Sequence, residues 1–227
     1  MALSTTIKAR KALKAHNEGH YEEAVKLYQE CVDEGCQDVK LCLAYSVLLL
    51  RGGEYQKARE LLVKIQKYPM TEDQKRQLYV NYAACVYKMG EIDRAVELME
   101  RQHEKNPSGL IYQTLGYLYV ELGDYDKALA YNTEALDYDD EDSITLDNMG
   151  QTYYRLGNDK EKAKEYFDKA HELKPGQLDT LYFLALYDID AGDGEAAREK
   201  LEKVREGRFS PLNYASRQKA ESLLEKL

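Results

Sequence analysis

The stretch Gly116–Leu136, GYLYVELGDYDKALAYNTEAL, contains a pattern that recurs along most of the chain. A small residue lies within an apolar helical pattern, and a Gly-Asp turn follows it. An aromatic residue comes two positions after the turn glycine, and an alanine comes five positions after it. A pattern that returns at a fixed period is the sequence signature of a repeat array.

Six turn glycines mark this period, and successive ones lie 34, 37, 33, 34 and 35 residues apart: Gly19, Gly53, Gly90, Gly123, Gly157 and Gly192. An alanine follows each glycine at the same offset: Ala24, Ala58, Ala95, Ala128, Ala163 and Ala197. Ala163 alone is one residue late, because one residue is added near Asn158-Asp159. The period therefore predicts six copies of one structural unit.

The residues within each period resemble the tetratricopeptide repeat, a helix-turn-helix unit of about 34 residues. The match is close in the fourth copy, with Tyr112, Leu115, Gly116, Tyr119, Gly123, Tyr125, Ala128 and Ala135. It is equally close in the fifth copy, with Leu146, Met149, Gly150, Tyr153, Gly157, Ala163, Phe167, Ala170 and Pro175. The resemblance covers roughly residues 5–211 and is specific for fold rather than for function.

The resemblance implies an all-α fold, a right-handed α-solenoid of helix pairs that forms a single superhelical domain over residues 1–227. The expected repeats are residues 5–38, 39–75, 76–108, 109–142, 143–177 and 178–211. Ser210 as a cap and Pro211 in a first turn predict a capping helix over residues 211–227. About thirteen helices are expected in all.

Two glycines lie inside expected helices rather than at turns. A helical glycine destabilises by roughly 0.5–1 kcal/mol relative to alanine, so Gly116 and Gly150 need a reason. In the tetratricopeptide pattern this position is small because a side chain there would hold the two helices of a repeat apart. Small residues occupy the same position in the other copies: Ala12, Ser46, Ala83 and Ala185.

Composition excludes several classes of partner. The net charge of -9 and the pI of about 5.1 disfavour nucleic acid, because an acidic chain repels phosphate groups. No apolar run approaches the roughly 20 residues that span a bilayer, and the N-terminal stretch lacks a signal-peptide core. Four unevenly spaced cysteines at expected helical positions (Cys31, Cys36, Cys42 and Cys85) indicate reduced thiols and a cytoplasmic protein. Proximity of Cys31 and Cys36 stays open.

Chemical motifs are weak throughout the sequence. His16 and His20 are four residues apart, but Gly19 ends the helix between them, which favours surface histidines over a metal pair. The acidic run over residues 137–142 lacks the glycine and glutamate of a calcium loop. Its expected role is to place negative charge at the N-terminus of the next helix. We expect no enzyme activity, no cofactor and no metal.

The first helix of each repeat, called helix A, offers the more informative surface. Positions 4, 7, 8 and 11 of helix A share one face, and positions 2, 5, 9 and 12 point roughly opposite, with position 6 beside them. The resemblance implies that the second set lines a concave groove in which partners bind. The candidate peptide-binding residues are Lys40, Leu43, Val47, Asn81, Tyr87, Gln113, Tyr117, Asn148, Gln151, Tyr154 and Tyr182. Asp147, Asp179 and Phe183 fall on the same face.

Aromatic rings and amides suit peptide recognition, because rigid rings give contact area at low entropic cost and an amide can hold an extended backbone. Two alternatives stay open: helix A is packed on all sides, or the groove holds the protein's own terminus. One subfamily is disfavoured. Tetratricopeptide domains that bind the acidic tails of heat-shock chaperones carry a carboxylate clamp of Lys, Asn and Arg, whereas Leu43, Val47, Leu110 and Thr114 stand at the corresponding positions around Asn81.

These observations favour a non-enzymatic interaction module that binds a peptide or helix of a partner protein in the concave groove. Two alternatives belong to other classes: a peptide-sensing regulator or secretion-type chaperone, and an accessory domain of a separately encoded enzyme. The expected partner is a protein or peptide, with no nucleic acid and no membrane, and the expected state is a monomer or weak homo-oligomer.

Overall fold

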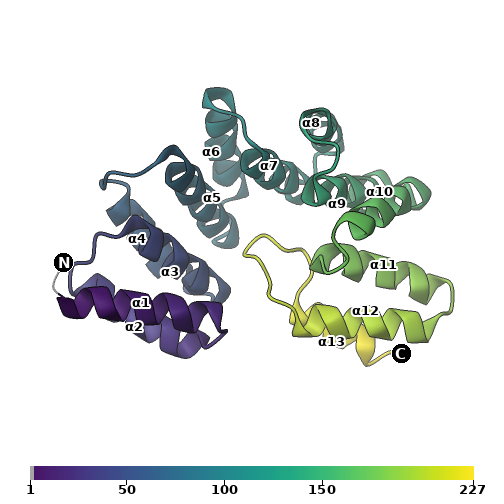
Figure 1. Ribbon diagram of the computed structural model, residues 1–227. Coiled ribbons are helices and arrows are strands. Elements are labelled where there is room, and N and C mark those ends of the chain that lie inside the picture. The colour runs from purple at the N-terminus through teal and green to yellow at the C-terminus, as the bar shows by residue number, and fades with distance from the viewer. Residues whose placement is uncertain (1–2) are drawn as a thin grey trace. The chain divides into compact units, whose positions relative to one another are not determined.

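A computed structural model describes residues 3–227, with side chains from residue 5 onward. These residues form thirteen α-helices and one π-helical turn, and no strand occurs among them (Figure 1). The chain folds as two compact units that join between residues 102 and 103, so the boundary falls inside one helix. The all-α helical repeat fold predicted from the period is confirmed.

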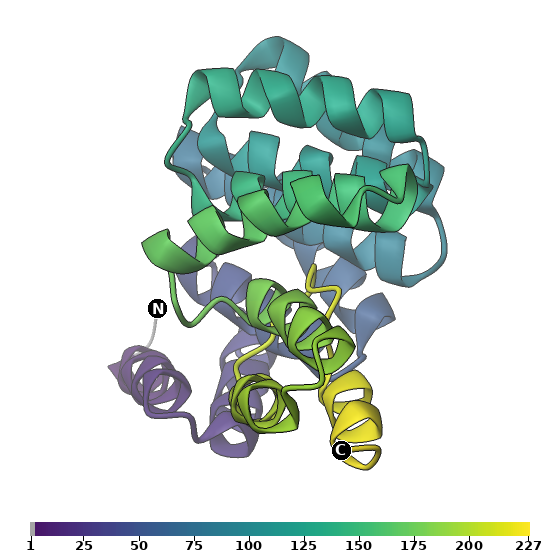
Figure 2. The same ribbon diagram turned by 90° about the vertical axis from the view of Figure 1, so that its right-hand side faces the viewer.

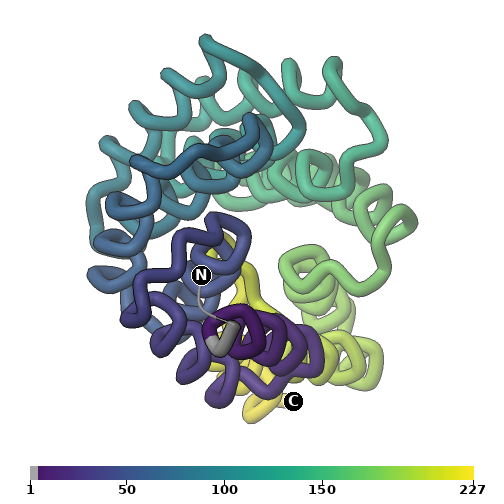
Figure 3. The backbone as a smooth tube through the Cα atoms, turned by 60° about the vertical axis from the view of Figure 1, so that its left-hand side comes forward, coloured from purple at the N-terminus to yellow at the C-terminus, as the bar shows by residue number. Residues whose placement is uncertain are grey.

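The first unit is built of helical hairpins joined by short turns, and the Cα tube in Figure 3 follows them in chain order. Its helices are α1 (Leu3–Asn17), α2 (Tyr21–Asp33), α3 (Val39–Arg51), α4 (Tyr55–Ile65), α5 (Glu72–Lys88) and α6 (Ile92–Lys105), the last of which continues into the second unit. Cys36 lies in the loop after α2 rather than at the helical position expected for it. All four cysteines are buried, and no disulfide joins them.

The second unit continues the same pattern. Its helices are α7 (Gly109–Leu122), α8 (Tyr125–Tyr138), α9 (Ser143–Gln151), the π-helical turn η1 (Thr152–Gly157), α10 (Lys160–Leu173), α11 (Leu178–Asp190), α12 (Gly194–Glu206) and α13 (Arg217–Leu224). Several helices begin at the side-chain caps that such sequences favour. Asp142, at the end of the acidic run, caps α9 by accepting a hydrogen bond from the Thr145 N–H at 2.7 Å.

The helical glycines lie where a side chain of the paired helix leaves no room for a Cβ atom, as predicted. A Cβ atom on Gly150 would stand 2.6 Å from the ring of Phe167 in α10, and one on Gly116 would stand 2.1 Å from the amide oxygen of Asn132 in α8. Real Cβ atoms essentially never approach that closely. The glycines therefore fix which faces of the two helices meet.

The extra residue of the fifth repeat is absorbed inside its first helix. The other five turn glycines have positive φ angles, between 78° and 87°, whereas in this repeat Asn158 takes that conformation with φ 50°. The six residues Thr152–Gly157 form the π-helical turn η1 just before it, and the Asp159 N–H bonds the carbonyl oxygen of Tyr153 at 3.0 Å. A π turn accommodates one additional residue within a helix, so the hairpin still closes.

The predicted start of the capping helix at Pro211 is wrong. Residues 207–216 form an irregular segment, and α13 begins at Arg217 with Ser216 as its N-cap, whose hydroxyl accepts a hydrogen bond from the Lys219 N–H at 3.1 Å. The segment leaves α12, extends beside α11 and returns into α13 (Figures 1 and 2).

Candidate functional site

In each unit we call the surface formed by the first helices of its repeats the helix-A face of that unit. In the first unit it comprises α1, α3 and α5, and in the second it comprises α7, α9 with η1, and α11. Of the eleven predicted binding residues, Lys40 is exposed, and Val47, Tyr87, Gln113 and Tyr154 are partly buried. The remaining six are buried: Leu43, Asn81, Tyr117, Asn148, Gln151 and Tyr182.

The two predicted amide side chains connect neighbouring A helices. Asn148 Nδ2 donates to the main-chain oxygen of Gln113 at 2.9 Å, from α9 to α7. In the first unit Asn81 Nδ2 lies 3.4 Å from the main-chain oxygen of Leu43 and 2.8 Å from the hydroxyl of Ser46, from α5 to α3. Both amides therefore satisfy polar groups of the preceding repeat, and their role toward a partner backbone stays a prediction.

The predicted tyrosines are also engaged within the fold. Tyr117 and Tyr182 are only 4% and 8% exposed, so they cannot reach a partner without rearrangement. Tyr154 packs edge-on against Phe183 and Tyr187, with ring centroids 5.2 and 5.7 Å apart. The accessible part of the predicted set is thus smaller than the face that helical periodicity defines.

A buried polar network joins α9 to α11 in the second unit. The carboxylate of Asp147 accepts hydrogen bonds from Thr180 Oγ1 at 2.6 Å and from Gln151 Nε2 at 2.7 Å. Gln177 extends the network by donating to the main-chain oxygen of Ser143 at 2.9 Å. Gln151, a predicted binding residue, therefore orients a carboxylate inside the fold.

Asp147 and Asp179 form a buried acidic pair, with 3% and 5% of their surfaces exposed. Burial, followed by the charge of Asp179, raises the pKa of Asp147 to about 7. Burial also raises the pKa of Asp179, and hydrogen bonds from the main-chain N–H groups of Ala215 and Tyr214 oppose that rise. An acidic pair of this kind requires donors, because an unpaired buried carboxylate is strongly destabilising.

The irregular segment supplies those donors. The Tyr214 N–H donates to Asp179 Oδ2 at 3.0 Å, and the Ala215 N–H donates to Asp179 Oδ1 at 2.8 Å. The Tyr214 ring stacks on Phe183 with centroids 5.1 Å apart and an interplanar angle of 23°, and it meets Tyr182 edge-on at 5.9 Å. Residues 214 and 215 are therefore held on the helix-A face of the last repeat by both backbone and ring.

Two cations complete the surroundings of Tyr214. The Arg155 guanidinium carbon lies 4.1 Å from the ring centroid, and Lys219 Nζ lies 3.2 Å from it. Arg155 is itself fixed by Glu121 Oε1 at 2.6 Å and Gln151 Oε1 at 3.0 Å. Arg155 belongs to η1, so the π-helical turn that absorbs the added residue also positions this cation.

Sequence reasoning placed Asp179, Tyr182 and Phe183 on this face but did not foresee Tyr214 or Arg155. Residues 211–227 read as a helix, which would have put Tyr214 on a regular helical surface. Arg155 lies beyond the helix-A positions that the repeat pattern assigns. The added residue near Asn158 is the one signal that could have drawn attention to η1.

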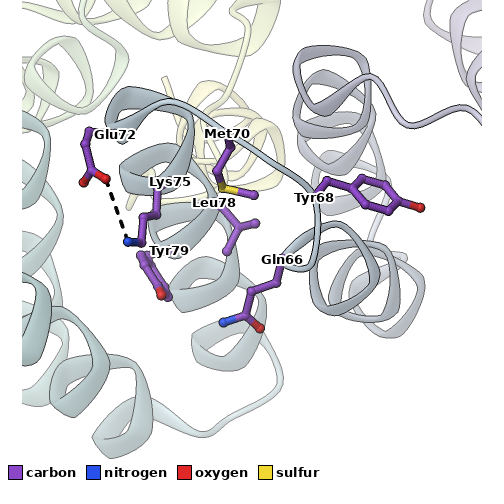
Figure 4. A pocket seen from close by; sticks show the side chains of 7 residues that line it. All are labelled: Gln66, Tyr68, Met70, Glu72, Lys75, Leu78 and Tyr79. Atoms are coloured by element: carbon purple, nitrogen blue, oxygen red, sulfur yellow. Dashed lines mark ion pairs between the residues drawn. The ribbon is translucent and has the colours of Figure 1, made fainter.

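A pocket of about 330 Å³ lies elsewhere, at the junction between α4 and α5 (Figure 4). Its lining comes from the connecting loop and the start of α5: Gln66, Tyr68, Met70, Glu72, Lys75, Leu78 and Tyr79. None of the eleven predicted residues lines it. Within residues 3–227 no group of three or more His, Cys, Asp or Glu side chains could hold a metal ion.

Two family profiles, both described as tetratricopeptide repeat, match the chain. One covers residues 8–117, and the other covers residues 110–142 and 145–177. The chain belongs to the tetratricopeptide repeat family. Together the profiles span five of the six repeats seen in the sequence, and proteins of this family serve as interaction scaffolds.

Curated relatives are similar over part of their length. The chain is 26% identical to the BBSome complex member BBS4 of Bos taurus over 142 residues, which is 62% of this chain and 26% of that protein. It is 23% identical to tetratricopeptide repeat protein 8 of Caenorhabditis elegans, over 61% of this chain and 28% of that protein. The chain thus matches about a quarter of the length of each relative.

Solved structures share the fold at low sequence identity. The type IV pilus biogenesis factor PilW superposes with a TM-score of 0.65 at 14% identity, over 99% of this chain and 100% of that one. TTC0263, a tetratricopeptide protein of Thermus thermophilus, gives 0.64 at 19% identity, over 85% and 98%. Among the described residues, none of the helices has the length and apolarity needed to cross a bilayer.

Proposed function

We propose that this chain is an interaction module that binds a peptide or helix of a partner protein on its helix-A face, in the concave groove that this repeat family forms. One observation carries the proposal: the helix-A face of the sixth repeat already holds an irregular segment of the chain, through the two N–H groups that Asp179 accepts and the ring that stacks on Phe183. A surface that holds one non-helical segment has the chemistry to hold another.

The accessible binding residues are those that the fold leaves uncovered. Lys40 is exposed, and Val47, Tyr87, Gln113 and Tyr154 are partly so. The buried members of the predicted set act indirectly, by fixing the spacing of the A helices. The likeness to BBSome complex members favours a partner that is a subunit of a multi-protein assembly.

Site-directed photo-crosslinking tests the proposal. A photoreactive amino acid replaces Lys40 or Gln113 on the helix-A face, and matched controls carry it at Val63 in α4 and Tyr138 in α8, which are 45% and 56% exposed. We expect the captured protein to be the same from both helix-A positions and absent from both controls. Crosslinks that come only from Val63 and Tyr138 would place the partner on the second helices and overturn the proposal.

A further inference from the structure

The irregular segment of residues 207–216 is built like a bound peptide rather than like a plain linker. Its first half forms a turn, in which the Asn213 N–H bonds the Ser210 carbonyl oxygen at 3.2 Å and the Leu212 N–H bonds the Ser210 hydroxyl at 3.3 Å. Pro211 suits such a turn because its φ angle is fixed. The turn delivers residues 213–215 to α11 in an irregular conformation, with two consecutive N–H groups facing Asp179.

The residues that receive this segment come from other parts of the second unit. Asp179 and Phe183 come from α11, and Arg155 comes from η1. Arg155 is held by Glu121 of α7 and by Gln151 of α9, neither of which belongs to the segment. The carboxylate, the aromatic face and the cation are therefore parts of a site whose geometry does not depend on residues 207–216 alone.

Asp179 needs a pair of donors at this place. Both of its carboxylate oxygens accept main-chain N–H groups, and the residue is 5% exposed. If the segment left without replacement, the Asp179 carboxylate would lose both of these hydrogen bonds, and solvent water or another peptide would have to supply the donors. An occupant that brings two consecutive N–H groups and an aromatic ring would restore them.

We propose that Asp179, Phe183 and Arg155 form a recognition site for a non-helical partner segment that carries an aromatic residue followed by a residue other than proline, and that Asn213–Ala215 occupies this site as an intramolecular competitor. The inference rests on the proposed function and specifies which part of the helix-A face a partner enters. The following residue cannot be proline because its N–H is one of the two that Asp179 accepts.

The competitor is tethered at both ends, to α12 and to α13. A short tether gives a local concentration of the order of millimolar, so a free peptide of the same sequence competes poorly with it. The apparent affinity for a partner is reduced by the fraction of molecules in which the site is vacant. Weakening the segment's hold therefore increases binding in trans without changing any residue of the site itself.

Fluorescence anisotropy with the chain's own segment tests the proposal. The probe is a labelled peptide of residues 208–217, RFSPLNYASR. It is added to the full wild-type chain, to Tyr214→Ala, to the double variant Tyr214→Ala/Ala215→Pro, and to the control Tyr138→Ala, which removes an exposed ring from α8. We expect the two segment variants to bind the peptide about tenfold more tightly than the wild type and the control do.

Two changes identify the contacts. A peptide with alanine in place of its tyrosine loses at least about tenfold in affinity for the double variant, as expected for removal of an aromatic anchor that stacks on Phe183. Adding Asp179→Asn to the double variant gives a similar loss, because the amide presents only one acceptor oxygen. Circular dichroism checks that each variant is folded. Equal binding, or no binding, by folded wild type and folded segment variants overturns the proposal.

Hydrogen exchange on the wild-type chain gives a readout that needs no variant. The Tyr214 and Ala215 amides exchange slowly while they are bonded to Asp179, and excess unlabelled peptide accelerates their exchange if it displaces the segment. Unchanged exchange at saturating peptide contradicts the proposal. This test and the crosslinking test can fail separately. Partner crosslinks at Lys40 or Gln113 without peptide binding would refute only the site at Asp179, Phe183 and Arg155. Peptide binding with crosslinks only at Val63 and Tyr138 would refute the proposed function.

Discussion

The side-chain amide of Asn148 donates a hydrogen bond to the main-chain oxygen of Gln113, 2.9 Å away and one repeat earlier. In the first unit, the side-chain amide of Asn81 lies in the same way 3.4 Å from the main-chain oxygen of Leu43. Position 6 of one repeat thus bonds position 5 of the repeat before it, in two separate places. We infer that these amides set the stacking distance between successive A helices.

Replacing Asn148 by alanine should therefore destabilise the chain without unfolding it. The change removes the amide that donates to the Gln113 carbonyl oxygen and leaves a small void. We expect the free energy of unfolding to fall by about 1–3 kcal/mol. Urea denaturation measures it. Asn106→Ala, at an exposed position in the same unit, is the control and should change stability by less than about 0.5 kcal/mol. Equal effects of the two substitutions would show that the interhelical bond does not contribute.

Gly150 admits no side chain. A Cβ atom there meets the Phe167 ring at 2.6 Å, so Gly150→Ala should lower stability by about 1–3 kcal/mol despite the better helix propensity of alanine, and Gly150→Leu should prevent native packing. The control is Gly109→Ala in the first turn of α7, where a Cβ atom meets nothing within 4 Å. Thermal melting compares the two, and a melting temperature for Gly150→Ala at or above that of Gly109→Ala would refute the proposed packing.

The acidic pair gives the protein a pH-dependent stability. The pKa of Asp147 is about 7 in the folded chain, compared with about 3.9 in an unfolded chain, because of burial and the charge of Asp179. Between about pH 3.9 and about pH 7, Asp147 keeps its proton in the folded state but has lost it in the unfolded state. The contribution of Asp147 to the free energy of unfolding is therefore greatest below about pH 4, and it is lost as the pH rises through about 7.

Asp147→Asn should flatten that dependence, since the amide does not ionise. Melting temperatures measured from pH 5 to pH 8 should fall less in the variant than in the wild type. Asp190→Asn on the same helix as Asp179 is the control, because its side chain is 58% exposed, and it should follow the wild-type curve. Parallel curves for Asp147→Asn and wild type would contradict the assignment.

Asn158 stands in the left-handed region that closes the fifth hairpin. Asparagine and glycine adopt that conformation readily, whereas a β-branched side chain does so at a cost of about 1–2 kcal/mol. Asn158→Gly should thus leave the unfolding midpoint nearly unchanged, and Asn158→Val should lower it. A stable Asn158→Val variant would mean that the π-helical turn has rearranged, which a crystal structure of the variant would reveal.

Most of the fold follows from sequence because its signals are local and repeated. The turn glycines, the small residues facing the neighbouring helix and the aspartate caps each act within one repeat, so one copy predicts the others. The start of α13 could not be predicted in this way. Ser210-Pro211 has the local features of a helix start, but contacts of Tyr214 and Ala215 with Asp179, some 35 residues earlier, hold this stretch out of a helix.

The candidate site was predicted less completely for a related reason. Helical periodicity assigns residues such as Asn148, Gln151 and Tyr182 to the face opposite the core of the repeat, but it does not state how closely the next A helix approaches. Asn148 and Gln151 are buried within the stacked helices, and Tyr182 is buried where the Tyr214 ring of the irregular segment meets it. Arg155 was missed because it lies beyond the helix-A positions that the repeat pattern assigns, inside a π-helical turn that the sequence does not distinguish from an ordinary insertion in a loop.

Residues 207–224 have two roles. The irregular stretch whose Tyr214 ring stacks on Phe183 leads directly into α13, and Lys219 of α13 lies over that ring. The position of α13 and access to the Phe183 ring thus depend on the same stretch of backbone. Proteolytic nicking within residues 207–216 would therefore loosen α13 and uncover the apolar ring of Phe183 at the same time.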